Sequence, residues 1–204
     1  MNEFRANRNS VFAEIGLKKT IENLIGEIQA LYEADEIPWV VGYSGGKDST
    51  AIAQLVWYAL EELPAVRRHK QVHVICSDTL VENPVVAAWV GRSLDSMTKA
   101  ADEKNLPISA HNLTPSLRDR FWVNLIGRGY PAPRHKFRWC TERMKIRPAD
   151  EFINSVVQEN GEAILVLGTR KAESSSRAHR MNTYESQRIR ENLNAHGTLP
   201  NAFV

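Results

Sequence analysis

Short apolar runs alternate along this chain with segments whose apolar residues follow helical spacing. Continuous apolar runs are typical of strands buried on both faces, as in parallel sheets. We expect strands at 39–44, 72–77, 108–113 and 163–168, and helices at 17–36, 48–63, 84–104 and 149–160. Such an alternation predicts an α/β fold in which a parallel, twisted sheet carries helices on both faces.

The length of 204 residues suits a single domain spanning 1–204. Within it we expect a helical lead-in over 10–37, a core over 38–178 and a C-terminal part over 179–204. The last residues, 199–204, are apolar and strand-like and contain no stop signal, so we expect a truncated chain.

Composition excludes several classes of protein. Hydrophobic residues make up 43% and charged residues 25%, which are ordinary globular values. The two cysteines, Cys76 and Cys140, exclude a disulfide framework and any four-cysteine metal or iron–sulfur site made by this chain alone. No apolar run approaches the ~18 residues of a membrane span, and no signal core follows the N-terminus. We expect a cytoplasmic protein.

Positive charge is concentrated in one segment, although the net charge of the chain is only +2. Residues 118–147 hold nine Lys or Arg against Asp119 and Glu142, a net of +7. The segment is either a solvated surface or an ordered loop around an anion. Its interleaved aromatic, glycine and proline residues favour the loop.

The motif Ser44-Gly45-Gly46-Lys47-Asp48-Ser49 lies between an expected strand and an expected helix. Its glycines permit a sharp turn and a close backbone approach, and the helix start presents free N–H groups to an anion. The two serines add hydroxyl donors and Lys47 adds a cation. Asp48 would repel phosphate alone, which suggests a bridging Mg²⁺. The alternative is a tight turn in which Asp48 caps the helix.

The segment after the second strand carries Asp78 and Glu82, ahead of the expected helix cap Asn83 and first helical residue Pro84. Asp78 is placed either to bind a ribose or cation, or to form a local capping turn. Its position beyond a parallel strand is one where ligands bind.

Cys140 lies among the cations Arg134, Arg138 and Lys145, which we assign to substrate or anion binding. Flanking cations favour the reactive thiolate. Cys140 is therefore either an acceptor of persulfide sulfur or a structural thiol beside an anion site. Cys76, inside a strand, is expected to be a buried small hydrophobe.

The last expected strand ends in Gly168, followed by Arg170, Glu173 and Arg177. A guanidinium can bind phosphate or sulfate oxygens in bidentate fashion, so we expect the two arginines to clamp such an anion and Glu173 to fix one of them. The alternative is a surface loop with an internal Glu–Arg pair.

The motif at 44–49 is similar to the PP-loop, SGGxDS, of the ATP pyrophosphatases. Residues 78–84, 138–148 and 168–177 resemble, in order, three motifs of the PAPS reductase branch of that superfamily. More narrowly, the residues at 38–44, 78–84 and 127–134 resemble those of the DndC family, the sulfurtransferases of bacterial DNA phosphorothioation.

The resemblance implies a fold of the HUP type, shared by adenine nucleotide alpha hydrolases. It implies cleavage of ATP·Mg²⁺ to AMP and pyrophosphate, which activates a DNA backbone phosphate for sulfur incorporation. It further implies a cysteine desulfurase and other Dnd proteins as partners, and a [4Fe–4S] cluster that the two cysteines of this chain do not support.

Applied residue by residue, the resemblance assigns nucleotide binding to the PP-loop, Asp78 and Gly168, and the metal to Asp48. Catalysis is assigned to Lys47, Asp48, Arg170 and Arg177. Two other functions remain open: a PAPS reductase or sulfate-adenylating enzyme of the same branch, and a nucleotide-gated DNA-binding module without turnover. A thioredoxin-linked reductase needs a cysteine on its C-terminal tail, and residues 179–204 contain none.

Overall fold

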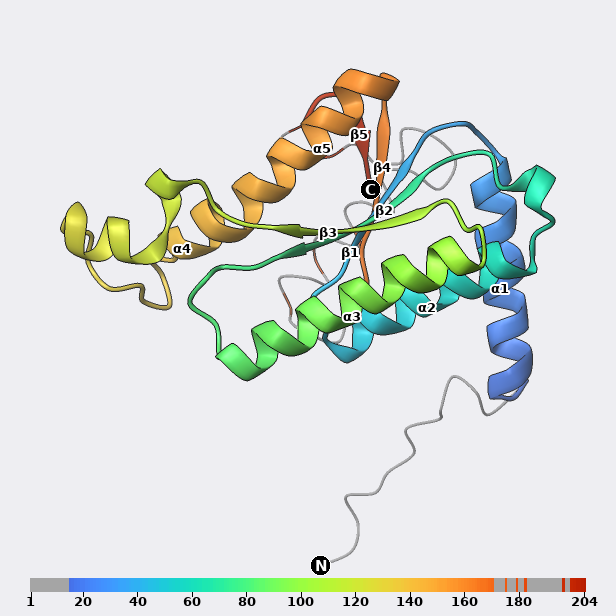
Figure 1. Ribbon diagram of the computed structural model, residues 1–204, viewed down its shortest axis with the longest axis horizontal. Helices are drawn as coiled ribbons and strands as arrows, with labels where there is room; N and C mark the ends of the chain where they lie inside the picture. The colour runs from blue at the N-terminus through green and yellow to red at the C-terminus, as the bar shows by residue number, and fades with distance from the viewer. Residues whose placement is uncertain (1–14, 171–174, 176–178, 180–181, 183–195, 197–198) are drawn as a thin grey trace, which may run out of the picture.

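The computed structural model describes residues 15–170, 175, 179, 182, 196 and 199–204. In this part of the chain, five strands form one sheet in the order β3-β2-β1-β4-β5 (Figure 1). Every pair of neighbours is parallel. The strands are β1 (Trp39–Gly42), β2 (Val72–Ser77), β3 (Ile108–Leu113), β4 (Ala163–Val166) and β5 (Ala202–Phe203).

Helices cover both faces of the sheet, as expected. Figure 1 shows α2 and α3 on one face and α5 on the other, with α1 beside α2. The long helices are α1 (Leu17–Glu33), α2 (Lys47–Glu62), α3 (Pro84–Glu103) and α5 (Arg147–Asn160), and a short turn η1 (Ala65–Arg67) precedes β2. The expected α/β fold is therefore confirmed.

Alternate residues of β1 enter two separate cores. Val41 packs with α1, α2 and α3, whereas Val40 packs under α5. Because successive side chains point to opposite faces of a strand, a continuous apolar run is needed to fill both cores. β5 contributes to the sheet from residues beyond 38–178, where we expect the core, and its Ala202 and Phe203 are buried.

β1 and β4 are each two residues shorter than their apolar runs. The pairing between them stops at Val41 and Val166. After β1 the chain enters the PP-loop and α2, on one face of the sheet, and no longer pairs with the chain after β4. Residues 43–44 and 167–168 lie beyond this pairing and line a cavity.

α1 ends at Glu33 rather than at residue 36, because Asp35 is used in a turn. Its Oδ1 accepts a hydrogen bond from the Ile37 amide at 2.9 Å and pairs with the buried Lys70 ammonium at 2.7 Å. Lys70 also lies 5.0 Å from the Trp39 ring centroid. This cluster joins α1 to the amino-terminal edge of the sheet, away from the cavity.

Two histidines lie side by side on the face that α5 covers. His73 Nδ1 and His111 Nε2 are 3.2 Å apart, and Phe152 of α5 packs against both rings. Burial and the neighbouring His111 lower the pKa of His73 to about 4. Burial also lowers the pKa of His111. Both imidazoles are therefore neutral at physiological pH.

The chain between β3 and α5, residues 114–146, projects from the carboxyl-terminal edge of the sheet; we call it the arm (Figure 1). It contains the short turns η2 (Leu117–Asp119), η3 (Val123–Gly127), α4 (Trp139–Thr141) and η4 (Glu142–Ile146). Among the described helices, none is long and apolar enough to cross a membrane.

Candidate nucleotide-binding site

A cavity of about 690 Å³ lies at the carboxyl-terminal edge of the sheet, where β1 and β4 part. Its walls come from the loop after β1, the ends of β2 and β4, and the start of α5. This is the switch point of the strand order, where open α/β sheets bind their ligands. Its apolar lining includes Ile75, Ile153 and Leu165.

The PP-loop has a fixed shape held by the hydroxyl of Ser49. This buried Oγ donates to the Gly46 carbonyl at 3.0 Å and accepts from the Ser44 amide at 3.1 Å. The Ser44 and Ser49 hydroxyl oxygens are also 3.1 Å apart. The Ser49 hydroxyl thus fixes the backbone of the loop from inside, while Ser44 is exposed at the cavity.

Two glycines bring the loop against its neighbours. Gly45 has φ 69°, and a Cβ there would lie 2.6 Å from the Trp89 ring of α3. A Cβ on Gly168 would lie 2.8 Å from the Asp48 carbonyl oxygen. The first turn of α2 therefore packs directly on the backbone after β4, which only glycine permits.

α2 begins at Lys47 with Gly46 as its N-cap, and no side chain caps it. Asp48 lies inside the first turn, so the alternative in which it caps the helix is wrong. The first-turn amides have no partner within the helix and point to the helix N-terminus. Such amides, together with the positive end of the helix dipole, favour an anion at this position.

Asp48 links the loop to the segment after β4. Its Oδ1 pairs with Arg170 Nε at 3.1 Å, and its Oδ2 lies 3.4 Å from Lys47 Nζ. The Lys47 side chain is 76% exposed, the Arg170 side chain 50% and the Asp48 side chain 28%. Two exposed cations are thus positioned by one carboxylate at the mouth of the cavity.

Asp78 and Lys145 line the same cavity. Asp78 Oδ1 accepts from the Leu80 amide at 2.8 Å, which makes a local turn, and Asn83 caps α3 through the Val85 amide. Lys145 pairs with Glu82 at 3.2 Å. Both sequence alternatives for Asp78 are thus compatible: it shapes a turn and also faces the cavity.

The two cysteines occupy different environments. Cys76 is buried and lines the cavity floor, and burial, together with the charges of Glu82 and Asp78, raises its pKa to about 11. It behaves as the small hydrophobe that we expect. Cys140 is half-buried in α4 and is not among the described residues that line the cavity.

The residues present do not fit a [4Fe–4S] cluster. The chain has two cysteines, and one is a buried strand residue. Within the described residues, no group of three or more His, Cys, Asp or Glu could hold a metal ion.

Arg134 and Arg138 lie on the arm, outside the described cavity lining. Glu173 and Arg177 lie outside the described residues. Of the residues we expect at the site, the cavity brings together Ser44, Gly46, Lys47, Asp48, Ser49, Asp78, Lys145 and Gly168. Gly45 of the same loop packs against Trp89, and Arg170 pairs with Asp48.

Two titratable groups at the cavity are not predicted from the sequence. Asp150, in the first turn of α5, and His196 both line it. Burial raises the pKa of Asp150, and the nearby His196 opposes that shift. An acidic residue in a first helical turn is ordinary, and His196 belongs to no motif, so the sequence carries no signal for either.

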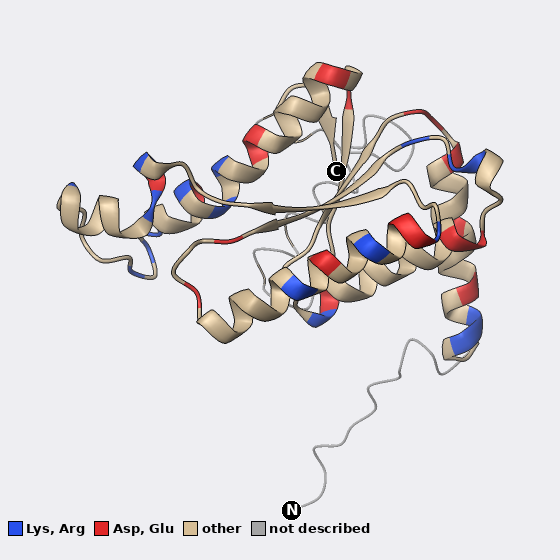
Figure 2. Ribbon diagram, viewed as in Figure 1, with Lys and Arg blue, Asp and Glu red and all other residues tan. Residues whose placement is uncertain are grey.

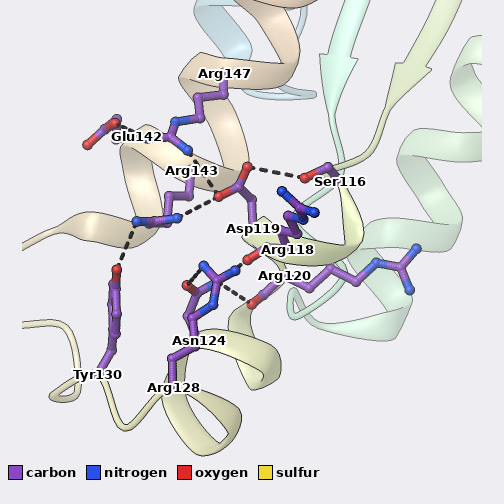
Figure 3. Close-up of polar contacts among 10 residues, drawn as sticks. All are labelled: Ser116, Arg118, Asp119, Arg120, Asn124, Arg128, Tyr130, Glu142, Arg143 and Arg147. Carbon is purple, nitrogen blue, oxygen red and sulfur yellow. Dashed lines mark hydrogen bonds and ion pairs between the residues drawn. The ribbon is translucent and has the colours of Figure 1, made fainter.

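The arm buries part of its positive charge in a network around Asp119 (Figure 3). Asp119 Oδ1 accepts from Arg143 at 2.7 Å and from Arg147 at 3.1 Å. Arg143 also donates to the Tyr130 hydroxyl, and Arg147 to Glu142. Burial alone would raise the pKa of Asp119, but the hydrogen bonds from Arg143 and Ser116 and the charge of Arg147 hold it below its ordinary value.

Three of the nine cations of 118–147 are thus paired: Arg143, Lys145 and Arg147. In the described part of the chain the other six form no ion pair; they are Arg118, Arg120, Arg128, Arg134, Lys136 and Arg138. Figure 2 shows Lys and Arg gathered on the arm.

Comparisons with known proteins find similar chains, among them a relative and a solved structure. An uncharacterized protein of Methanocaldococcus jannaschii is 27% identical over 173 residues. The alignment covers 85% of this chain and 31% of the relative, so the chain spans about a third of the relative's length. A U34-tRNA thiolase, NcsA, from Methanococcus maripaludis with its [4Fe–4S] cluster has a TM-score of 0.46 and 18% identity, over 84% of this chain and 52% of that one.

The model of the phosphoadenosine phosphosulfate reductase domain matches residues 38–195, which include the PP-loop, the arm and the cavity lining apart from His196. This match covers well over half of the chain. The chain therefore belongs to the phosphoadenosine phosphosulfate reductase domain family.

Proposed function

We propose that this chain binds ATP·Mg²⁺ in the cavity and cleaves it between the α- and β-phosphates. The observation that carries the proposal is the convergence of the PP-loop, the N-terminus of α2 and Arg170 at the point where β1 and β4 part. A phosphate chain bound there meets backbone N–H groups on one side and two exposed cations on the other.

The side chains have distinct roles in this proposal. Lys47 and Arg170 stabilise the charge that develops on the leaving pyrophosphate, and Arg177 adds a further cation. Asp48 holds Arg170 through Oδ1. Its Oδ2, whose Lys47 partner is mostly exposed, is the ligand we assign to the Mg²⁺ that accompanies the nucleotide.

The acceptor that we propose is a DNA backbone phosphate. A non-bridging oxygen of this phosphate attacks the α-phosphorus of ATP, the bond to the β-phosphate breaks, and pyrophosphate leaves. The terminal sulfur of a protein persulfide then displaces AMP from the DNA phosphorus, and a thiol reduces the remaining disulfide link. This is DNA phosphorothioation as in the DndC family, with a cysteine desulfurase and other Dnd proteins as partners.

Two features support a polyanionic acceptor. The arm leaves six cations outside ion pairs in the described residues, and it adjoins the cavity through Lys145. Cys140, also on the arm, is the residue that we propose as a possible carrier of the persulfide.

The test is to identify the products after incubation with ATP, Mg²⁺ and DNA, which supplies the proposed acceptor phosphate. The wild-type chain should release pyrophosphate, and AMP when water takes the place of the persulfide and displaces it from the DNA phosphorus. Lys47→Ala should lower the rate of pyrophosphate release by about tenfold to a hundredfold, because it removes a cation that stabilises the leaving pyrophosphate. Lys99→Ala, which removes an exposed lysine of α3, is the matched control and should retain the rate.

Other products would overturn the proposal. ADP and phosphate would exclude cleavage between the α- and β-phosphates. Nucleotide binding without any turnover would favour the nucleotide-gated DNA-binding module. Stimulation of pyrophosphate release by sulfate rather than by DNA would identify a sulfate-activating enzyme of the same family instead.

A further inference from the structure

The arm has a small aromatic core of its own. Trp139 is buried, stacks on Phe121 with ring centroids 5.5 Å apart, and meets Tyr130 edge-on at 5.5 Å. Its indole Nε1 donates to the Pro131 carbonyl at 3.0 Å. These contacts fix the loop on both sides of residues 134–138.

Residues 134–138 form a closed turn on that core, which we call the finger. The Arg134 amide donates to the Phe137 carbonyl at 3.0 Å, and the Phe137 amide donates to the Arg134 carbonyl at 2.9 Å. All five side chains, Arg134, His135, Lys136, Phe137 and Arg138, are exposed. A rigid turn thus presents three cations, an imidazole and an aromatic ring to solvent.

The charges of the finger differ from those beside it. Arg143 of the arm and Arg147, the first residue of α5, are held by Asp119 and Glu142 of the arm. In the described residues no carboxylate pairs with Arg134, Lys136 or Arg138. Cations that are left outside ion pairs on a fixed turn favour an anionic partner rather than a role in folding.

The exposed rings indicate the kind of anion. Phe137 is 46% exposed and Trp122, on the same arm, is 59% exposed. An aromatic face between cations matches a nucleic-acid strand, whose bases stack on the ring while its phosphates meet the charges. A base inside a closed duplex has both faces covered, so stacking requires an unpaired base.

We propose that the finger binds an unpaired stretch of nucleic acid, with Phe137 stacked on a base and Arg134, Lys136 and Arg138 on backbone phosphates. The inference rests on the proposed function in one respect: the bound strand is the one that supplies the acceptor phosphate. It adds that this strand is opened or single-stranded where the arm holds it.

The test is fluorescence anisotropy of a labelled oligonucleotide, single-stranded or annealed to its complement, titrated with the full chain in the absence of ATP. Wild type should bind the single strand more tightly than the duplex. Phe137→Leu keeps an apolar side chain and removes the ring, and should weaken single-strand binding by about fivefold to a hundredfold.

A second variant tests the charges. Replacing Arg134, Lys136 and Arg138 together by Gln should reduce the slope of log affinity against log salt by about two. The matched control replaces three exposed lysines outside the arm, Lys18, Lys19 and Lys99, by Gln, and should retain the wild-type slope and affinity.

Three results would overturn the inference: tighter binding to the duplex, unchanged binding in both finger variants, or an equal loss in the control. Competition by poly-glutamate as strong as that by the oligonucleotide would show that only charge is read. Because the assay contains no ATP, these results are distinct from a failure to release AMP, which would overturn the proposed function alone.

Discussion

The PP-loop and the arm both present cations at the same edge of the sheet, but different contacts hold them. The PP-loop takes its shape from backbone approach, because Gly45 lies under Trp89 and Gly168 lies against the Asp48 carbonyl. The arm takes its shape from side-chain pairing around Asp119 and from the rings on Trp139. The loop should therefore be sensitive to added volume, and the arm to lost charge and to pH.

The largest effect is expected from Asp119→Ala. It removes the carboxylate shared by the largely buried Arg143 and the partly exposed Arg147, so two charge-assisted hydrogen bonds are lost and the free energy of unfolding should fall by about 3 kcal/mol. Urea denaturation measures the loss, and ATP binding should survive it. Asp95→Ala, at an exposed site on α3, is the control; equal losses in the two variants would contradict the role of the network.

Gly168→Ala tests the other side of the comparison. The new Cβ would meet the backbone of Asp48, so the free energy of unfolding should fall by about 1–3 kcal/mol and ATP affinity should fall with it. Gly26→Ala, in α1 with open space around the new methyl group, should instead stabilise the chain by about 0.5–1 kcal/mol. ATP titration and urea denaturation of both variants measure these changes, and equal stability and affinity in the two variants would contradict the role of the Gly168 contact.

The histidine pair under α5 and the arm should respond to acid in different pH windows. The folded pKa of His73 is lowered to about 4, so the unfolded chain binds more protons below pH 6.5 and stability falls as the pH drops from 6.5 toward 4. We expect a loss of about 1–2 kcal/mol by pH ~5, after allowance for partial exposure. His73→Leu should flatten this part of a stability profile.

The Asp119 contribution is also lost on acidification, but in a lower pH window than that of His73. Its pKa is lowered in the folded arm, so its stabilisation is present above the ordinary value of 3.8 and is lost as the pH falls through the lower folded value. A profile that keeps its slope between pH 6.5 and 4 in His73→Leu would contradict the assignment to the histidine pair.

The smallest effect is expected from Glu82→Gln, which breaks the ion pair that ties the end of the arm to the segment after β2. Both side chains are substantially exposed, so the change in unfolding free energy should stay below about 1 kcal/mol and vanish in concentrated salt. Denaturation in low and high salt measures this difference. A loss that persists in high salt would point to packing rather than charge.

The sequence predicts the sheet well because both of its faces are buried. The ranges of β2 and β3, the Asn83 cap and Pro84 start of α3, and the end of α5 before Gly161 agree with the pattern, since each depends on local residues. The ends of β1 and β4 are overestimated, because the divergence of the two strands there depends on topology and not on hydrophobicity.

The site is predictable where its residues are contiguous and not where they are distant. The PP-loop and Gly168 follow from motifs, but the contact of Gly168 with Asp48 joins parts of the chain that no spacing rule relates. Residues 118–147 contain nine Lys and Arg, but the sequence does not tell which of them form ion pairs. Asp119, the shared partner, lies 24 residues from Arg143 and 28 residues from Arg147.

The pairing of β1 with β4 has a consequence for assembly of the chain. Trp39 lies opposite Ile164, so the two halves of the phosphate site come together across 125 residues of sequence. Contacts of such separation form slowly, since the intervening loop must close first. Nucleotide affinity should therefore arise late in refolding, after the helical signal has recovered. A free nucleotide concentration of 100 times the Kd would raise the free energy of unfolding by about 2.7 kcal/mol. The bound nucleotide would therefore stabilise the pairing of β4 with β1 after it has formed.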